Sequence, residues 1–257
     1  MSALGATLRA VRDRGGRSFV PYVTGGYPGV DADLLRSLEA AGADALEIGI
    51  PHSDPIMDGG VIQEASSTAL ERGTRPADVL DTVRAADLRI PVAVMTYVNP
   101  VFRRGVEAFL DDAAAAGVAG AIVPDLPVDE AAAFEAAAVE RGIDVVLLAA
   151  PGTAETRYAA IAAASRGFVY CVATYGVTGV REELGGAARE VVEALRPLTD
   201  LPLLVGVGIG TPPQAAQACS FADGVIVGSA LMAALADGGA GAVQNLAEAF
   251  RTAIPRA

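Results

Sequence analysis

Short apolar runs rich in β-branched residues alternate along the chain with Ala-rich helical segments. Glycine-containing turns join helix to strand several times, as in Ala41-Gly42-Ala43-Asp44 and Arg141-Gly142-Ile143. Glycine after a helix provides the left-handed C-terminal turn, and a continuous apolar strand is typical of a sheet buried on both faces. The pattern therefore predicts an α/β protein with a parallel sheet.

Eight such strands are predicted, with helices between them. The strands are residues 18–23, 45–48, 92–95, 120–123, 145–148, 168–172, 203–205 and 225–227, and the helices include 31–41, 61–72, 106–116, 129–141, 154–164, 188–195 and 212–218. Eight alternations in 257 residues predict a single (β/α)8 TIM barrel over 1–257, with a short extra N-terminal helix. A doubly wound open sheet is the alternative.

Composition narrows the possible partners. Hydrophobic residues make up 52% of the chain, and the net charge is −12 with no basic run, which argues against binding to nucleic acid. Glycines and prolines interrupt the uncharged stretch 201–222, so we expect no membrane span there. Cys171 and Cys219 form no short-spaced motif, and the N-terminus lacks a signal-peptide core. A cytoplasmic location is therefore expected.

Three carboxylates follow one another near the end of the second strand. Glu47 lies within an apolar strand, and Asp54 and Asp58 lie in the loop after it. A buried acid is costly unless it is paired or used, and burial raises its pKa toward the range useful for proton transfer. Either catalysis or an ion pair with a nearby arginine would explain Glu47. His52 is the only histidine, so a multi-histidine metal site is hard to build.

The barrel fold predicts where an active site would lie, because TIM-barrel sites form at the carboxyl ends of the strands. Glu47 and Asp58 would face this mouth. Other residues at strand ends should join them: Thr24, Tyr97 with Asn99, Asp125, Tyr170 and Gly208.

Glycine-rich turns after the last two strands indicate a phosphate site. The sequences are GVGIGT (206–211) and GS (228–229), and each opens a helix. Backbone amides at a helix start bind anions, and this pair of loops commonly holds phosphate in TIM barrels. A dinucleotide fingerprint fits poorly, because Thr211 stands near the position of its third glycine, far from the first βαβ unit. Residues 174–180 are expected to form either a lid over the substrate or a disordered loop.

Taken together, these segments resemble the α subunit of tryptophan synthase over nearly the whole chain. The resemblance is carried by PYVTGGYP (21–28), EIGIP (47–51), SDPIMDG (53–59), MTYVNP (95–100), PDLP (124–127), GVTG (176–179), GVGI (206–209) and GSA (228–230). It implies a TIM barrel that splits indole-3-glycerol phosphate into indole and glyceraldehyde 3-phosphate, a retro-aldol reaction that needs no cofactor in this chain.

The resemblance also implies roles for individual residues. Glu47 would be the general acid and base, and Asp58 would accept the indole N–H. Thr178 would bond Asp58 when the lid closes. Substrate-binding positions would be Tyr22, Met95, Leu148, Tyr170, Thr178, Gly179, Val207, Gly208, Ile226, Gly228 and Ser229, of which Gly179, Gly208, Gly228 and Ser229 would hold the phosphate.

A protein partner is implied as well. The family pairs with a β subunit that carries pyridoxal phosphate, in an α2β2 heterotetramer, and contacts are expected near Pro51 and Asp54. His52, in an exposed loop, is assigned no role. A stand-alone lyase and a regulatory subunit with weak chemistry are the alternatives. Gly60 replaces the proline common in the family, which loosens the backbone beside Asp58.

Overall fold

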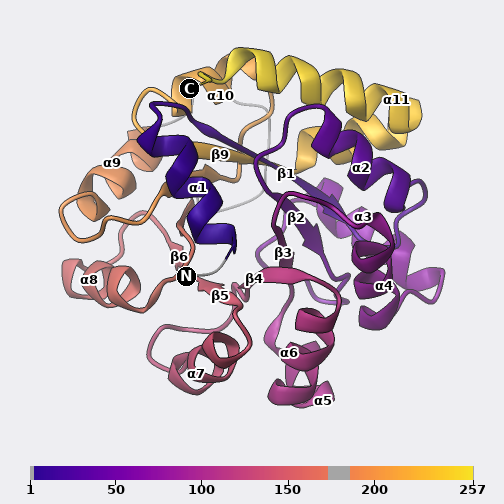
Figure 1. Cartoon of the computed structure of the whole chain (residues 1–257), viewed down its shortest axis with the longest axis horizontal. Helices are drawn as coiled ribbons and strands as arrows, with labels where there is room; N and C mark the ends of the chain where they lie inside the picture. The colour runs from indigo at the N-terminus through magenta and orange to yellow at the C-terminus, as the bar shows by residue number, and fades with distance from the viewer. Residues whose placement is uncertain (1–2, 173–185, 257) are drawn as a thin grey trace.

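Parallel strands follow one another around a barrel in the computed structural model, which describes residues 3–172 and 186–256 (Figure 1). The strands are β1 (Ser18–Thr24), β2 (Leu46–Gly49), β3 (Val92–Met95), β4 (Val118–Ile122), β5 (Asp144–Val146), β6 (Leu148–Ala149), β7 (Val169–Val172), β8 (Leu203–Gly206) and β9 (Gly224–Val227). Their order in the sheet is β5-β4-β3-β2-β1-β9-β8-β7-β6.

The fifth predicted strand joins the two edges of this sheet. It is divided at Leu147 into β5, which pairs with β4, and β6, which pairs with β7. The carbonyl of Leu147 also accepts a hydrogen bond from the amide of Tyr170, at 3.1 Å. The sheet therefore curls into a nearly closed barrel. The TIM-barrel prediction is confirmed, and the open-sheet alternative is wrong.

The helices surround the sheet and agree closely with the predicted segments. They are α1 (Ala3–Asp13), α2 (Ala32–Ala40), α3 (Gly60–Glu71), α4 (Pro76–Ala86), α5 (Val98–Arg104), α6 (Val106–Ala115), α7 (Ala132–Glu140), α8 (Glu155–Ala164), α9 (Gly186–Leu195), α10 (Pro212–Ala218) and α11 (Ser229–Ala253). The helices α4 and α5 lie outside the segments named from sequence. They give the second and third βα units an additional helix.

The N-terminal helix α1 lies across the amino ends of the strands, in front of the barrel in Figure 1. Its Gly5 amide donates to Asp144 Oδ2 at 3.1 Å, at the start of β5. Leu4 packs over Gly120 of β4, where a β-carbon would stand 2.4 Å from the leucine. This helix therefore covers the end of the barrel opposite the predicted active site.

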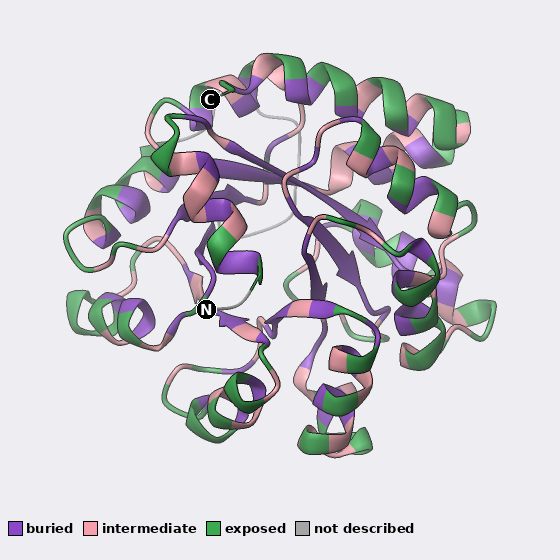
Figure 2. Cartoon of the chain, viewed as in Figure 1, coloured by how far each residue is buried: buried purple, intermediate pink, exposed green. Residues whose placement is uncertain are grey.

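Burial follows the expectation for a sheet covered on both faces. Every residue of β1, β2, β8 and β9 is buried, whereas the helices expose only their outer faces (Figure 2). Along the described stretches of the chain, no helix has both the length and the apolar character to cross a membrane. Glu47 on β2 is the one charged side chain in these four buried strands, so its burial needs an explanation.

Candidate active site

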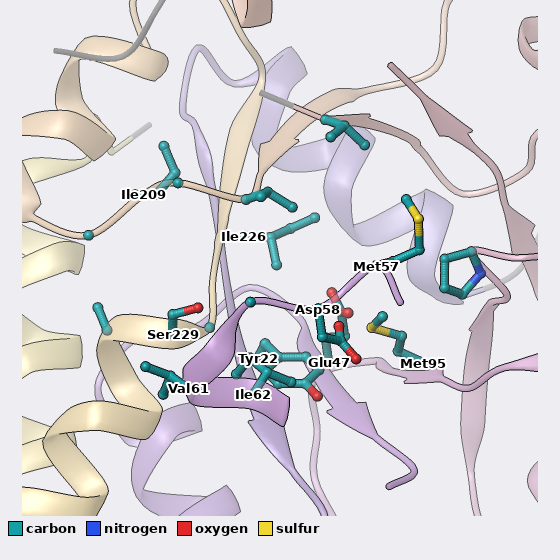
Figure 3. Close-up of a pocket in the computed structure, with 18 of the residues that line it drawn as sticks. Tyr22, Glu47, Met57, Asp58, Val61, Ile62, Met95, Ile209, Ile226 and Ser229 are labelled. Carbon is teal, nitrogen blue, oxygen red and sulfur yellow. The ribbon is translucent and has the colours of Figure 1, made fainter. Parts of the chain in front are cut away.

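A cavity of about 630 Å³ opens at the carboxyl ends of the strands, and Figure 3 shows the side chains around it. The structure brings together these predicted site residues on its walls: Tyr22, Glu47, Asp58, Met95, Leu148, Tyr170, Val207, Gly208, Ile226, Gly228 and Ser229. Thr178 and Gly179 lie outside the described residues, as do the predicted lid and the Thr178–Asp58 contact. Their roles stay predictions.

Glu47 is an acid sealed within the barrel. Its side chain is only 1% exposed, and Oε2 is buried without a hydrogen-bond partner among the described residues. No described basic group pairs with it, so the ion-pair alternative finds no support in this part of the chain. Burial, reinforced by the nearby charge of Asp58, raises the pKa of Glu47 to about 8. This carboxyl group is therefore protonated at neutral pH.

Asp58 reaches the same cavity from the loop between β2 and α3. Figure 3 shows its carboxylate beside that of Glu47. The hydroxyl of Tyr97 donates to Asp58 Oδ2 at 3.2 Å. Burial raises the pKa of Asp58 to about 6, and the Tyr97 hydrogen bond opposes this rise. At neutral pH, Asp58 is therefore mostly ionised while Glu47 holds its proton.

Tyr97 connects this loop to the rest of the barrel. It follows β3, and its oxygen accepts a hydrogen bond from the Met57 amide at 3.0 Å. On its other side, the His52 ring stacks on Tyr97 with centroids 4.7 Å apart. His52 is partly buried by this stacking, whereas Ser53 and Asp54 after it are exposed. Sequence placed Tyr97 at the barrel mouth but did not predict its bond to Asp58.

The predictions for three strand-end residues need correction. Asp125 and Asn99 are absent from the cavity wall. Instead, Asp125 Oδ1 accepts a hydrogen bond from the Val98 amide at 2.8 Å, at the first turn of α5. Thr24 is fully buried, and its Oγ1 lies 3.3 Å from the Tyr22 hydroxyl. Asp125 and Thr24 therefore make hydrogen bonds near the strand ends and do not line the cavity.

Two tyrosines in the cavity depend on glycines in neighbouring strands. A β-carbon on Gly49 would stand 2.1 Å from the Tyr22 hydroxyl, and one on Gly206 would stand 2.2 Å from that of Tyr170. Glycine is therefore required at both strand ends to admit the phenol rings. Burial raises the pKa of each phenol, so both remain neutral hydrogen-bonding groups.

The predicted phosphate end lies across the cavity from the carboxylates, where Figure 3 shows Ser229. Gly228 is the N-cap of α11 and supplies no side-chain acceptor to the first turn. The first amides of a helix lack intrahelical partners, so those following Gly228 can bind an anion. The turn before α10 differs, because Gln214 Oε1 accepts from the amides of Gly210 and Thr211 at 2.8 and 3.1 Å.

The loop after β8 has an unusual backbone. Val207 has a φ of +67° and Gly208 a φ of +90°. A positive φ is unfavourable for a β-branched residue and is typical of functional sites that hold strain. Both residues line the cavity beside the α11 N-terminus, so this conformation shapes the cavity wall.

Sequence reasoning missed much of the apolar lining. These wall residues come largely from loops and helix starts: Ile56, Met57, Val61, Ile62, Ile122, Pro124, Val172, Ile209, Ala233 and Leu246. Their apolar character predicted that they are buried, but it did not predict that they line this cavity. Such a cavity can hold an aromatic ring between the carboxylates and the anion-binding end. Among residues 3–172 and 186–256, no group of three His, Cys, Asp or Glu could hold a metal.

The segment expected to meet a partner is only partly accessible. Pro51 is buried within the chain, whereas Asp54 is exposed and accepts a hydrogen bond from the Ser53 hydroxyl at 2.7 Å. Ile56 beside it is 76% exposed and Met57 is 40% exposed. The loop that carries Asp58 thus also presents apolar side chains to the solvent.

Known proteins resemble this chain in sequence and structure over nearly its full length. The family model described as tryptophan synthase alpha chain matches residues 8–254. The tryptophan synthase alpha chain of Synechocystis is 44% identical over 263 residues, covering 99% of this chain and 100% of the relative. That of Streptomyces avermitilis is 45% identical over 238 residues, covering 91% and 86%.

Solved structures agree. A structure of Mycobacterium tuberculosis tryptophan synthase is 41% identical with a TM-score of 0.93, covering 100% of this chain and 99% of that one. The tryptophan synthase alpha chain of Legionella pneumophila is 33% identical with a TM-score of 0.88, covering 98% and 97%. The chain belongs to the tryptophan synthase alpha chain family, which cleaves indole-3-glycerol phosphate.

Proposed function

We propose that Glu47 and Asp58 perform the retro-aldol cleavage of indole-3-glycerol phosphate as two acids in opposite protonation states. The observation that carries this proposal is their shared cavity, in which Glu47 has a pKa of about 8 and Asp58 a pKa of about 6. One fold thereby supplies a proton donor and an anion at the same pH. The reaction needs both.

The first step is protonation of the indole ring. Glu47 donates its proton to indole C3, and the ring nitrogen becomes positively charged. Asp58 accepts the N–H hydrogen bond and stabilises this charge electrostatically. The Tyr97 hydrogen bond holds the Asp58 carboxylate in its ionised form and in position for this contact.

The second step breaks the carbon–carbon bond between indole C3 and the glycerol phosphate chain. Glu47, now ionised, takes the proton from the hydroxyl on the adjacent carbon, which becomes the aldehyde. The bonding electron pair returns to the indole ring and neutralises the nitrogen. One proton is added to carbon and one removed from oxygen, so no cofactor or oxidant is consumed.

The cavity also positions the two ends of the substrate. The phosphate group would lie at Gly208, Gly228 and Ser229, where helix-start amides and the Ser229 hydroxyl are available. The indole would lie among apolar residues such as Met95 and Ile226. Thr178 and Gly179 are proposed to complete the site on ligand binding. Orientation of this kind lowers the entropic part of the barrier.

A β partner would receive the indole. The family and the solved tryptophan synthase of Mycobacterium tuberculosis support such a partner. The exposed Asp54, Ile56 and Met57 are the proposed contact segment, with an α2β2 assembly in the cytoplasm. Pyridoxal phosphate would belong to the partner and supply the condensation of indole with serine there.

Indole release from indole-3-glycerol phosphate, measured with and without a purified β subunit, tests this function. Strong activation by the β subunit supports the proposed role, whereas high turnover by the isolated chain indicates a stand-alone lyase. Absence of turnover in both conditions contradicts an enzymatic role and leaves a regulatory subunit.

A further inference from the structure

A second cavity, of about 460 Å³, lies at the opposite end of the barrel, near the starts of β1 and β2. Its charged lining consists of Arg14, Arg17, Asp44, Arg251 and Arg256. Four guanidinium groups thus face a single carboxylate in a chain whose net charge is −12. The arginines come together because the end of α1 lies beside the C-terminal end of α11 (Figure 1).

Arg251 is the most buried of the four. Only 4% of it is exposed, and its Nη1 donates to Asp44 Oδ2 at 2.8 Å. Its Nη2 donates to the carbonyls of Arg17, Ile254 and Pro255 at 3.1 to 3.3 Å. Its Nε is buried without an acceptor among the described residues. The buried guanidinium group of Arg251 is therefore only partly compensated by the described residues.

The remaining arginines differ in how many of their donors are used. Arg17 donates through Nε to the Cys219 carbonyl at 3.2 Å and through Nη1 to the Gly16 carbonyl at 2.9 Å. The side chains of Arg14 and Arg256 make no hydrogen bond or ion pair within the described part of the chain. Two guanidinium groups are therefore available at the cavity mouth.

Asp44 does not neutralise this cluster. Its Oδ2 already accepts from the Phe19 amide and from Arg251 Nη1, both at 2.8 Å. Burial lowers the pKa of Arg251, and the charge of Arg256 lowers it further, while Asp44 opposes the change. The cavity thus retains an excess of positive charge that an anion would relieve.

The cavity wall is kept open by small residues. Gly42 has a φ of +94°, and a β-carbon there would stand 2.9 Å from Arg251 Cγ and 3.5 Å from Arg256 Nη2. Ala40, Ala41 and Ala43 form the adjoining wall. Gly42 therefore lies against the aliphatic part of the Arg251 side chain, and a larger residue there would crowd both Arg251 and Arg256.

We propose that this cavity binds a small phosphate-bearing anion through the exposed guanidinium groups of Arg14 and Arg256, beside the buried charge of Arg251. Guanidinium groups match phosphate oxygens in geometry and charge, and two or more together favour a multiply charged anion over chloride. The site is separate from the substrate cavity, because it lies at the amino ends of the strands. Its occupant would tie the end of α1 to the end of α11.

Titration calorimetry with inorganic pyrophosphate at low ionic strength tests the proposal on the full chain. Wild type should bind, and Arg14→Gln/Arg256→Gln should weaken binding at least tenfold. The matched control is Arg36→Gln/Arg84→Gln, which removes the same charge from exposed arginines paired with Asp33 and Asp81. That control should bind within twofold of wild type.

Three outcomes would overturn the site. These are no binding by wild type at millimolar pyrophosphate, equal weakening in both double variants, and wild-type binding by Arg14→Gln/Arg256→Gln. The last result would place the anion in the substrate cavity instead. Far-UV circular dichroism and melting temperature verify that each variant is folded, and Arg14→Lys/Arg256→Lys should recover part of the affinity.

Discussion

The Tyr97 hydroxyl donates to Asp58 Oδ2 at 3.2 Å and accepts from the Met57 amide at 3.0 Å. One oxygen atom therefore fixes both the backbone and the carboxylate of the loop after β2. The proposed reaction depends on this loop, because Asp58 must meet the indole nitrogen in its ionised form. The hydrogen bond contributes to both requirements.

Tyr97→Phe should shift the acidic limb of the pH–rate profile to higher pH. In wild type, the hydrogen bond from Tyr97 lowers the pKa of Asp58, so the phenylalanine variant should have a higher Asp58 pKa. At pH 6, kcat/KM should fall by roughly 10- to 100-fold, the cost of a hydrogen bond to a charged group. Steady-state kinetics between pH 5 and 9 measure the shift. A uniform loss with an unmoved limb would mean that Tyr97 acts on the fold alone.

Glu47→Gln should reduce cleavage by roughly 10²- to 10⁴-fold, because glutamine cannot transfer the proton. The dissociation constant for glyceraldehyde 3-phosphate should stay within about threefold of wild type, which is a small change in binding energy. The reason is that the phosphate end lies across the cavity from Glu47. Single-turnover indole release and product binding measure the two effects. Near-normal turnover would remove Glu47 from the catalytic role.

The same substitution should change how stability depends on pH. The pKa of Glu47 is about 8 in the folded chain against an ordinary value of 4.5. Folded protein therefore binds this proton more tightly, so stability is full below pH 4.5 and is lost as pH rises through 8. Wild type should therefore lose stability from pH 5 to pH 9, and Glu47→Gln should not lose this part. The unfolding free energy of Glu47→Gln minus that of wild type should increase by roughly 2–4 kcal/mol from pH 5 to pH 9. Urea denaturation of both proteins at pH 5 and pH 9 measures this change. The same variant-minus-wild-type difference at both pH values would contradict the raised pKa of Glu47.

Gly60→Pro should stabilise the chain by about 0.4–1 kcal/mol. Gly60 is the first residue of α3, where proline needs no donor, and a β-carbon there would meet nothing within 4 Å. The preceding Gly59 has φ −78° and ψ 164°, which suits a residue before proline. Gly73→Pro is the control and should destabilise, because Gly73 has a φ of +83°. Thermal and urea unfolding measure the stability of both variants. An equal loss of stability in Gly60→Pro and Gly73→Pro would show that the start of α3 does not accept proline.

Val207→Gly should raise the free energy of unfolding by about 1 kcal/mol, because glycine adopts a positive φ without strain. The Michaelis constant should rise several-fold as the cavity loses part of its wall. Val172→Ala is the control: it lines the same cavity from β7 without a positive φ and should destabilise by about 1–3 kcal/mol. Similar destabilisation by both variants would show that Val207 is not strained.

The sequence predicts the barrel well because each repeat carries its own signal. Apolar strands such as β3 were located with their bounds, since burial on both faces demands a continuous apolar run. The division of the fifth strand at Leu147 was not predictable, because its residues read as one apolar segment. Pro76 opens α4 at a position where proline is favoured, but a second helix after β2 departs from simple alternation.

The site is predictable to a smaller extent. Glu47 is conspicuous because it is a charged residue in an apolar strand, and Asp58 follows in the loop after that strand. Their separate roles were implied by the family resemblance. The Tyr97 contact depends on how a loop folds back over β3, and no local pattern encodes that. The arginine cavity joins segments at both ends of the chain, more than 200 positions apart, and each arginine alone reads as ordinary surface.

The pH dependence of kcat/KM for indole-3-glycerol phosphate tests the central claim most directly, because this ratio reports ionisations of the free enzyme. The account predicts a bell-shaped profile that rises through the pKa of Asp58, about 6, and falls above that of Glu47, about 8. A rate that stays level or rises between pH 8 and 9.5 would contradict it, because Glu47 could not then be the proton donor.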